Sequence, residues 1–381
     1  MAALTEEQSM IQEQAKTWAS EEAPVAKFRE MRDSGNELGF DKATWEAIAE
    51  IGWAGIIVPE NLGGVEMGHL TFGVILEELG RQLTASPLVA SGLIGANALL
   101  VAGSDAQKTE WLPKICDGST ILTLAVDEGP RHDPSRIALE ASTAGDGFVL
   151  NGTKTHVLEG LAADQFVVAA RTSGKSGETD GITLFLVPAN ASGIDRSRLA
   201  TADSRGYAKV TFAGVKVGND AVLGTVGDGF APLDRILDRA RAGLAAEMLG
   251  TAAQSFDMTL DYLKNRVQFG QPIGSFQALG HRASNLFTEM EMARSCIEAA
   301  LQAIDNDADD AHNVAKLCSL AKFKANAFLH HMSNELIQIH GGIGMTDEFD
   351  AGLFLKRARA AEATFGNEAF HRNRYATFAG L

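Results

Sequence analysis

The sequence of 381 residues has few of the residue types that mark secreted, metal-binding or nucleic-acid-binding proteins. Its three cysteines, Cys116, Cys296 and Cys318, stand far apart. A disulfide framework needs a dense, even set and a zinc site needs paired spacing, so reduced, buried cysteines are expected and no metal site. Basic residues are also scarce, since 33 Lys and Arg stand against 49 Asp and Glu for a net charge of −16. That balance argues against nucleic acid or an anionic membrane as the main partner.

No stretch of the chain has the pattern of a leader peptide or a membrane span. The first ten residues contain two glutamates and no basic stretch followed by an apolar one, so no signal peptide is evident and a cytoplasmic protein is expected. Residues 86–103 lack charge over almost the length of a span. Because this stretch contains several glycines and Asn97, we interpret it as a buried core helix.

Hydrophobic periodicity divides the chain into three regions. Helical spacing covers residues 1–118, short β-rich runs cover 119–226, and helical spacing returns over 227–381. We therefore predict an α+β protein of three domains. These are an N-terminal α-helical domain, a small middle β domain resembling a barrel or sandwich, and a C-terminal α domain resembling a four-helix bundle, with four or five long helices.

Local signals refine this prediction in two places. Asn151-Gly152 lies between two β-rich runs and predicts a type I′ hairpin turn. In the helix that begins near Pro232, the apolar stripe places Asp238 on the opposite, solvated face. Residues 305–310 are expected to form an acidic loop between two later helices.

The segment from Arg266 to Gln277 combines an arginine, glutamines and an aromatic residue with a Gly/Pro break after a long helix. An arginine side chain grips a phosphate with a planar fork, and a ring such as Phe269 stacks on a flat heterocycle. The alternative is a plain interhelical loop with an exposed arginine.

The segment from Gln338 to Thr346 contains the paired glycines Gly341 and Gly342 after another predicted helix. Such glycines bring backbone N–H groups close to an anion such as a pyrophosphate. The alternative is a helix C-cap at Gly341 followed by a turn. The dinucleotide-binding fingerprint is excluded, because no strand precedes the glycines.

Together and in this order, the two segments resemble the acyl-CoA dehydrogenase family, and the α–β–α order agrees with it. The resemblance implies an FAD cofactor, oxidation of an acyl-CoA thioester to the trans-2-enoyl-CoA, and an electron-transfer flavoprotein that reoxidises the flavin. In the family a carboxylate removes the α proton and the β hydride goes to flavin N5. The resemblance also implies a dimer or tetramer in which the two segments contact a neighbouring subunit's FAD, through Arg266, Gln268, Phe269, Gln338, Gly341 and Gly342.

The chain departs from the family at the catalytic base. The family's usual glutamate corresponds to Phe365, and the position used by other members corresponds to Ala240. Glu368, three residues after Phe365, is expected to point elsewhere. A third acid, Glu247, lies two turns after Ala240, about 10 Å along the helix axis, on the apolar stripe. A buried acid there is a candidate base, and the alternative is a structural ion pair with an arginine such as Arg241 or Arg282.

The segments that face the flavin ring in the family also differ. Val126 and Asp127 stand at the family's Thr-Glu-Pro-Gly-like turn. His156 stands at its shielding tryptophan, and Leu158, which cannot donate a hydrogen bond, at its hydroxyl residue. A lone histidine at such a position is usually exposed, which is the alternative for His156.

Three hypotheses are compatible with these residues. The first is a self-assembled dehydrogenase that uses Glu247 or another acid as base. The second is a non-catalytic subunit that completes the FAD site of a homologous catalytic subunit in an α2β2 assembly. The third is a flavin enzyme of this fold with a different reaction. The sequence does not specify the acyl-chain length or ring structure of the substrate.

Overall fold

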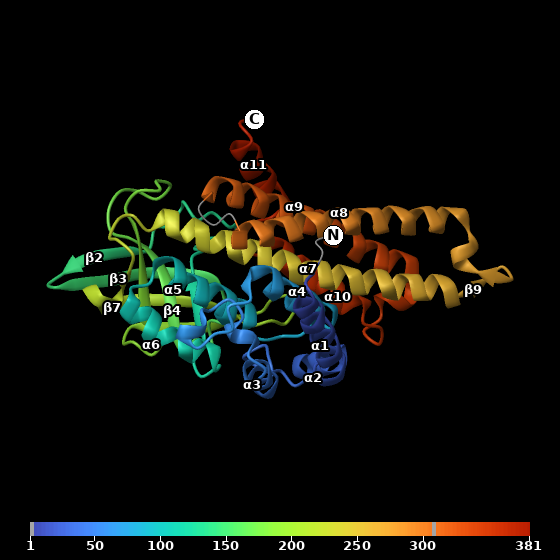
Figure 1. The fold of residues 1–381 in the computed structure, drawn as a ribbon, viewed down its shortest axis with the longest axis horizontal. Helices are drawn as coiled ribbons and strands as arrows, with labels where there is room; N and C mark the ends of the chain where they lie inside the picture. The colour runs from blue at the N-terminus through green and yellow to red at the C-terminus, as the bar shows by residue number, and fades with distance from the viewer. Residues whose placement is uncertain (1–3, 307–309) are drawn as a thin grey trace. The chain divides into compact units, whose positions relative to one another are not determined.

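The computed structural model describes residues 4–306 and 310–381, and its elements follow the predicted order of helices, strands and helices (Figure 1). Its contacts form two compact units. The first contains Met1–Arg29, His69–Thr84 and Arg241–Leu381, and the second contains Glu30–Gly68 and Ala85–Ala240. Each unit is therefore assembled from segments that are distant in the sequence.

The N-terminal region is helical, with the bounds α1 Glu6–Glu22, α2 Val25–Asp33, α3 Lys42–Glu50, α4 Gly68–Arg81, α5 Ala96–Ala102 and α6 Asp105–Cys116. Thr5 and Ser104 begin α1 and α6 with reciprocal capping boxes, each closed by a glutamine side chain. The uncharged stretch forms a π-helix, Leu88–Gly95, followed by α5, and it is largely buried as predicted. Within the described residues, no helix combines the length and apolar character needed to cross a membrane.

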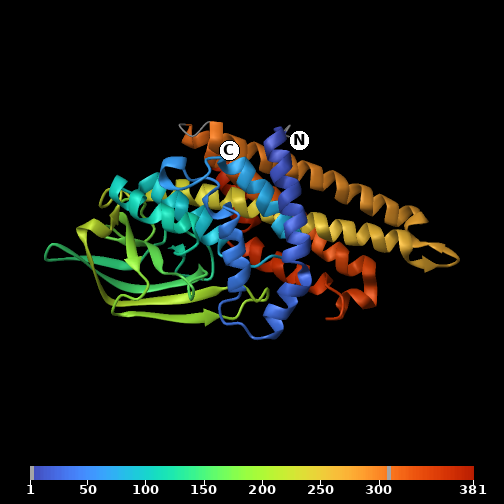
Figure 2. The ribbon, with the colours of Figure 1, turned by 60° about the horizontal axis from the view of Figure 1, so that its bottom comes forward.

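The middle region forms one mixed sheet in the second unit, whose strands lie side by side in green and yellow-green (Figure 2). Its order is β6-β7-β3-β2-β4-β5-β8, with β1 paired to β4. Central strands β4 and β5 are buried on both faces, which explains their continuous apolar sequences. The strand bounds are β1 Leu122–Ala125, β2 Glu140–Ala144, β3 Gly147–Leu158, β4 Gln165–Arg171, β5 Ile182–Pro188, β6 Ile194–Leu199, β7 Tyr207–Gly218 and β8 Val222–Leu223.

The predicted hairpin turn at Asn151-Gly152 is wrong, because both residues lie inside the continuous strand β3. The β2–β3 hairpin instead turns at Gly145, which has a φ of 62°. At Asn151 the register with β7 shifts, and Gly214, with a φ of 69°, is the extra residue of the resulting bulge. The Gly214 amide donates to the Asn151 side chain at 2.8 Å. Asn-Gly thus serves a bulge here rather than a turn.

The C-terminal region contains α7 Phe230–Asn265, α8 Gln277–Asn306, α9 Ala311–His340, α10 Ala351–Ala363 and α11 Glu368–Phe378. Three of these five helices are long and two are short, so the expectation of four or five long helices is corrected. Asp238 was placed on a solvated face, but it is 3% exposed. The acidic loop was predicted over residues 305–310. Residues 305 and 306 belong to α8, which ends at Asn306, and residues 307–309 lie outside the described residues. These elements confirm the predicted fold class of a helical region, a β-sheet region and a second helical region.

A close crossing of α4 and α7 fixes the surroundings of Glu247 in the first unit. A Cβ at Gly250 would lie 1.8 Å from the Glu77 carbonyl oxygen, and a Cβ at Gly80 would lie 2.2 Å from the Glu247 carbonyl oxygen. The Thr251 hydroxyl donates to the Gly80 carbonyl at 3.2 Å. Glycine at both positions lets the two backbones approach closely, and the backbone at Glu247 is therefore held against α4.

Candidate functional site

The segment after Arg266 forms a tight two-stranded hairpin at the end of α7. Strands β9 Val267–Gln268 and β10 Gln271–Pro272 pair around Phe269 and Gly270, whose φ values are 52° and 80°. Positive φ at both central residues is the geometry of a type I′ turn. The hairpin extends beyond the ends of α7 and α8 (Figures 1 and 2), and Phe269 at its tip is 90% exposed. An aromatic ring and an adjacent arginine are thus presented outward on a short, defined support.

The Gln338–Thr346 segment ends α9 and leaves two glycines open. Gly341 has a φ of 61°, and its N–H donates to the Ile337 carbonyl, so the predicted C-cap is present. A Cβ built at Gly341 or Gly342 meets nothing within 4 Å. The open space and exposed backbone are the features that a bound phosphate needs, and Gln338 is exposed one turn before them.

A stack of rings brings the two segments together in the first unit. The His340 ring lies between Tyr262 and Phe349, with ring centroids 4.3 Å and 4.7 Å away. Tyr262 belongs to the last turn of α7, and its carbonyl accepts from the Arg266 N–H. Arg266 and the paired glycines therefore follow two helix ends that are packed against each other. Burial lowers the pKa of His340, which favours a neutral ring in this stack.

The fit of these residues to FAD rests on chemistry that this structure displays. Arg266 presents an exposed guanidinium fork, Phe269 offers an exposed ring, and the Gly341–Gly342 backbone offers unfilled space. These groups suit the pyrophosphate and adenosine half of the cofactor. In the described part of the chain, no group of three His, Cys, Asp or Glu side chains is arranged to hold a metal ion.

In the second unit, the predicted flavin-facing residues lie on β3 and the loop after β1. Val126 is buried, and Asp127 is half-buried with a carboxylate oxygen 2.9 Å from His132 Nδ1. The Asp127 carbonyl accepts from the Thr155 N–H at 2.8 Å, which joins this loop to β3. His156 is exposed, as its alternative predicted, and has a φ of 53°. His132 was not predicted from the sequence. The only indication of its contact with Asp127 is the spacing of five residues between them in one loop.

An ion pair between Lys154 and Glu128 joins the same loop to β3. Lys154 of β3 is fully buried, and its Nζ lies 2.6 Å from Glu128 Oε1 and 3.0 Å from the Val126 carbonyl oxygen. Burial lowers the pKa of Lys154, and the adjacent Glu128 carboxylate opposes that shift. Leu158 is half-buried, and its carbonyl accepts from the Thr123 hydroxyl at 2.7 Å. Only the backbone of Leu158 is engaged in this contact.

Neither expected base position carries a carboxylate. Phe365 is 6% exposed and has a φ of 57°, which is unusual for a bulky side chain. Its carbonyl accepts from His371 Nε2 at 3.0 Å. Ala240 is fully buried, and Glu368 is exposed in the first turn of α11. The turn that carries Phe365 therefore buries Phe365 and Gly366 in the first unit and contains no acid.

Glu247 is buried, as predicted, and lies in an ion pair. Arg357 of α10 approaches its Oε1 with Nη2 at 2.9 Å and Nε at 3.0 Å, and both side chains are 6% exposed. Of the two partners suggested by the sequence, Arg282 was wrong. Arg282 pairs with Glu335, and Arg241 places Nε 3.5 Å from the Phe365 carbonyl oxygen. Arg357 lies 110 residues along the chain, and helix packing rather than sequence spacing brings it to Glu247.

Comparison with known proteins places this arrangement in a family. Sequence profiles for the N-terminal, middle and C-terminal domains of acyl-CoA dehydrogenase match residues 5–119, 126–215 and 227–379. The chain belongs to the acyl-CoA dehydrogenase family, an oxidoreductase family whose members are FAD flavoproteins.

Individual relatives cover nearly the whole chain. The CarC subunit of the caffeyl-CoA reductase–Etf complex of Acetobacterium woodii is 29% identical, over 91% of this chain and 90% of the relative. The mitochondrial 2-methylacyl-CoA dehydrogenase of Solanum tuberosum is 29% identical, over 97% of this chain and 89% of the relative. A chain of the ChsE4–ChsE5 complex from Mycobacterium tuberculosis superposes with a TM-score of 0.87 at 27% identity, over 99% of this chain and 98% of that chain.

Proposed function

We propose that this chain is one subunit of an FAD-dependent acyl-CoA dehydrogenase that converts an acyl-CoA thioester to the trans-2-enoyl-CoA. In this proposal a homologous partner subunit supplies the catalytic carboxylate, in an α2β2 assembly. The observation that carries the proposal is that none of the three candidate positions for the catalytic base holds an unpaired carboxylate. Phe365 and Ala240 have no acid, and Glu247 is paired with Arg357.

The chain's own residues would serve the cofactor of the neighbouring subunit. Arg266 binds a phosphate oxygen, Phe269 covers a ring of the adenosine half, and the Gly341–Gly342 backbone accommodates the pyrophosphate. When bound, FAD supplies the acceptor for the β hydride, and an electron-transfer flavoprotein reoxidises it. The exposed, apolar Phe269 and Met345, which are 90% and 76% exposed, support burial of this surface in an assembly. The similarity to a chain of a complex of two differently named components supports a mixed assembly.

A second candidate is a self-sufficient homo-oligomeric dehydrogenase. It is favoured by the presence of both FAD-contacting segments in one chain, which would let each copy complete the site of another. In that case Glu247, or an acid still to be identified, acts as the base after release from Arg357. A cytoplasmic location is part of both proposals.

The test is to express the chain alone and together with a homologous subunit, and to record absorbance spectra before and after addition of a panel of acyl-CoAs. The proposal expects little bound flavin in the chain alone, and a yellow complex that an acyl-CoA bleaches. About one FAD per chain and full bleaching without a partner would contradict it and support the homo-oligomer.

A pair of arginine variants tests the role of the hairpin in the same experiment. Arg266→Gln should lower the FAD content of the complex, because the phosphate loses its planar fork of donors. Arg372→Gln changes another exposed arginine, on α11, and should leave the FAD content unchanged. Equal FAD content in the two variants would remove Arg266 from the cofactor site.

A further inference from the structure

The turn between α10 and α11 is held by buried polar side chains from three other places in the first unit. Asn326 Nδ2 of α9 lies 3.3 Å from the Gly366 carbonyl oxygen, and Arg241 Nε of α7 lies 3.5 Å from the Phe365 carbonyl oxygen. His371 of α11 contacts that same Phe365 carbonyl oxygen. Positive φ values at both Phe365 and Gly366, 57° and 112°, make this conformation dependent on such support.

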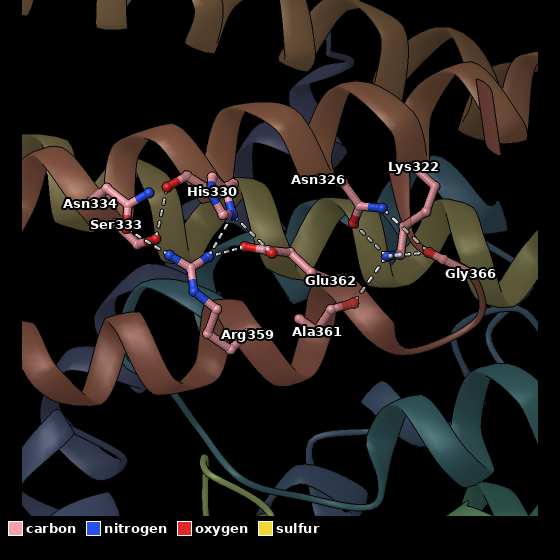
Figure 3. A network of polar contacts seen from close by, with 9 residues as sticks. All are labelled: Lys322, Asn326, His330, Ser333, Asn334, Arg359, Ala361, Glu362 and Gly366. Carbon is pink, nitrogen blue, oxygen red and sulfur yellow. Dashed lines mark hydrogen bonds and ion pairs between the residues drawn. The ribbon is translucent and has the colours of Figure 1, made fainter. Parts of the chain in front are cut away.

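Lys322 of α9 is the centre of this support. Its side chain is fully buried, and Nζ lies 2.7 Å from Asn326 Oδ1, 2.9 Å from the Ala361 carbonyl oxygen and 3.4 Å from the Gly366 carbonyl oxygen (Figure 3). An ammonium group has three N–H donors, which matches these three oxygens. The lysine thus joins the last turn of α10 to the backbone immediately after Phe365.

A neighbouring cluster fixes α10 against α9. Arg359 donates to Glu362 Oε1 at 2.6 Å and to Asn334 Oδ1 at 2.7 Å, and His330 Nδ1 lies 3.1 Å from Glu362 Oε2 (Figure 3). The contacts of Arg359 with Asn334 and of Glu362 with His330 therefore join α10 to α9 without Lys322. The contact from Lys322 to Gly366 is the longest of its three, and it is the one that reaches beyond α10 into the turn.

We propose that Lys322 is a positioning residue that fixes the turn of residues 364–367, and with it the Phe365 side chain, by donating to backbone carbonyls before and within the turn. This inference rests on the proposed function in one respect, namely that the turn matters for the reaction. By its resemblance to the family, the turn corresponds to the base position, and its conformation then decides what this chain places there. No catalytic step is assigned to Lys322, because its amine is buried among protein oxygens.

The proposal includes a dependence on pH. Burial lowers the pKa of Lys322 to about 7, with the nearby cations Arg357 and Arg241 acting in the same direction and Glu362 opposing them. His371 is the titratable group that faces the turn from α11. Above this pKa the neutral amine has two N–H donors for three oxygens, so the long contact to Gly366 weakens. The turn therefore opens more readily as the pH rises from 6 to 8.

Hydrogen exchange of the full-length chain, followed by mass spectrometry of peptides covering residues 361–371, tests this. After correction for intrinsic exchange rates, the wild-type turn should lose protection between pH 6 and 8. Lys322→Met should raise exchange at pH 6 by about ten- to a hundredfold and make it independent of pH, since it removes hydrogen bonds from a charged donor. Lys324→Met, two residues along the same helix, should match the wild type, because its amine lies over the Phe323 ring.

Three results would overturn the proposal. They are a wild-type profile that does not change with pH, wild-type protection in Lys322→Met, or a pH dependence that persists in that variant and so belongs to another group. If Lys322→Met does not fold, Asn326→Ala replaces it. Because the ammonium then loses its acceptor at 2.7 Å, exchange should rise and its midpoint should move to lower pH. A midpoint equal to that of the wild type would contradict the role of Lys322. Because exchange requires neither FAD nor a partner, these outcomes are separate from the fate of the proposed function.

Discussion

The ion pair between Glu247 and Arg357 gives the sharpest prediction, because it separates a structural acid from a catalytic base. Both side chains are 6% exposed, and two guanidinium nitrogens approach one carboxylate oxygen at 2.9 Å and 3.0 Å. Removing one partner of such a buried pair takes this close contact from a charge that stays buried. Each of Glu247→Gln and Arg357→Met should therefore lower the free energy of unfolding by about 3–5 kcal/mol.

The double variant carries most of the information. Once one partner is absent, loss of the second adds little, so the double variant should be more stable than the sum of the single changes predicts, by about 2 kcal/mol or more. Urea unfolding of the four proteins, followed by circular dichroism, measures this coupling. The matched control is the pair Arg282–Glu335, in which Arg282 is 41% exposed. Its coupling should be below about 1 kcal/mol.

The same variants test catalysis. In the co-expressed complex, Glu247→Gln should bleach with acyl-CoA at the wild-type rate whenever the protein is folded. Coupling no larger than in the control pair would refute the structural assignment. A folded Glu247→Gln complex that no longer bleaches would refute the proposal that a partner supplies the base.

Three further predictions follow from other contacts. Gly250→Ala should lower the free energy of unfolding in urea by about 1–3 kcal/mol, because its Cβ would lie 1.8 Å from the Glu77 carbonyl oxygen. The control Gly280→Ala, whose Cβ meets nothing within 4 Å, should raise that free energy slightly. Phe269→Ala should leave unfolding unchanged but reduce assembly and FAD content, measured by light scattering and absorbance, since Phe269 is 90% exposed; unchanged assembly and flavin would contradict the hairpin's role. The pKa of Lys322 is about 7 in the folded chain and 10.5 in an ordinary lysine, so between these values the unfolded chain binds one more proton. The free energy of unfolding should then rise with pH by about 1.4 kcal/mol per unit in the wild type relative to Lys322→Met, and equal slopes in the two proteins would contradict the lowered pKa.

The last prediction concerns a different equilibrium from hydrogen exchange at the turn. Global unfolding releases the amine into water, where it regains its proton, and this produces the rise in stability with pH. Opening of the turn leaves the amine buried, so only the number of its hydrogen bonds changes. Stability of the whole chain and protection of the turn should therefore move in opposite directions above pH 7.

Local patterns along the chain were enough to predict the class of fold and to find the two segments that mark the family. Periods of 3.6 and 2 residues are local properties, and they correctly separated the helical regions from the sheet. The same local reasoning placed Glu247 on the buried side of α7, because its neighbours on that face are apolar. It failed at Asn151-Gly152, where the same residues suit a turn and a bulge, and only the pairing with β7 decides between them.

The tertiary structure alone decided which side chains meet. Arg357 reaches Glu247 across 110 residues, His340 lies between Tyr262 and Phe349, and Lys322 reaches the turn that follows Phe365. Asp238 is buried although the helical wheel placed it in water, because a long helix packed on several sides has no single solvated face. Each of these contacts depends on how helices pack, and packing is set by the shapes of many side chains together rather than by spacing along one segment.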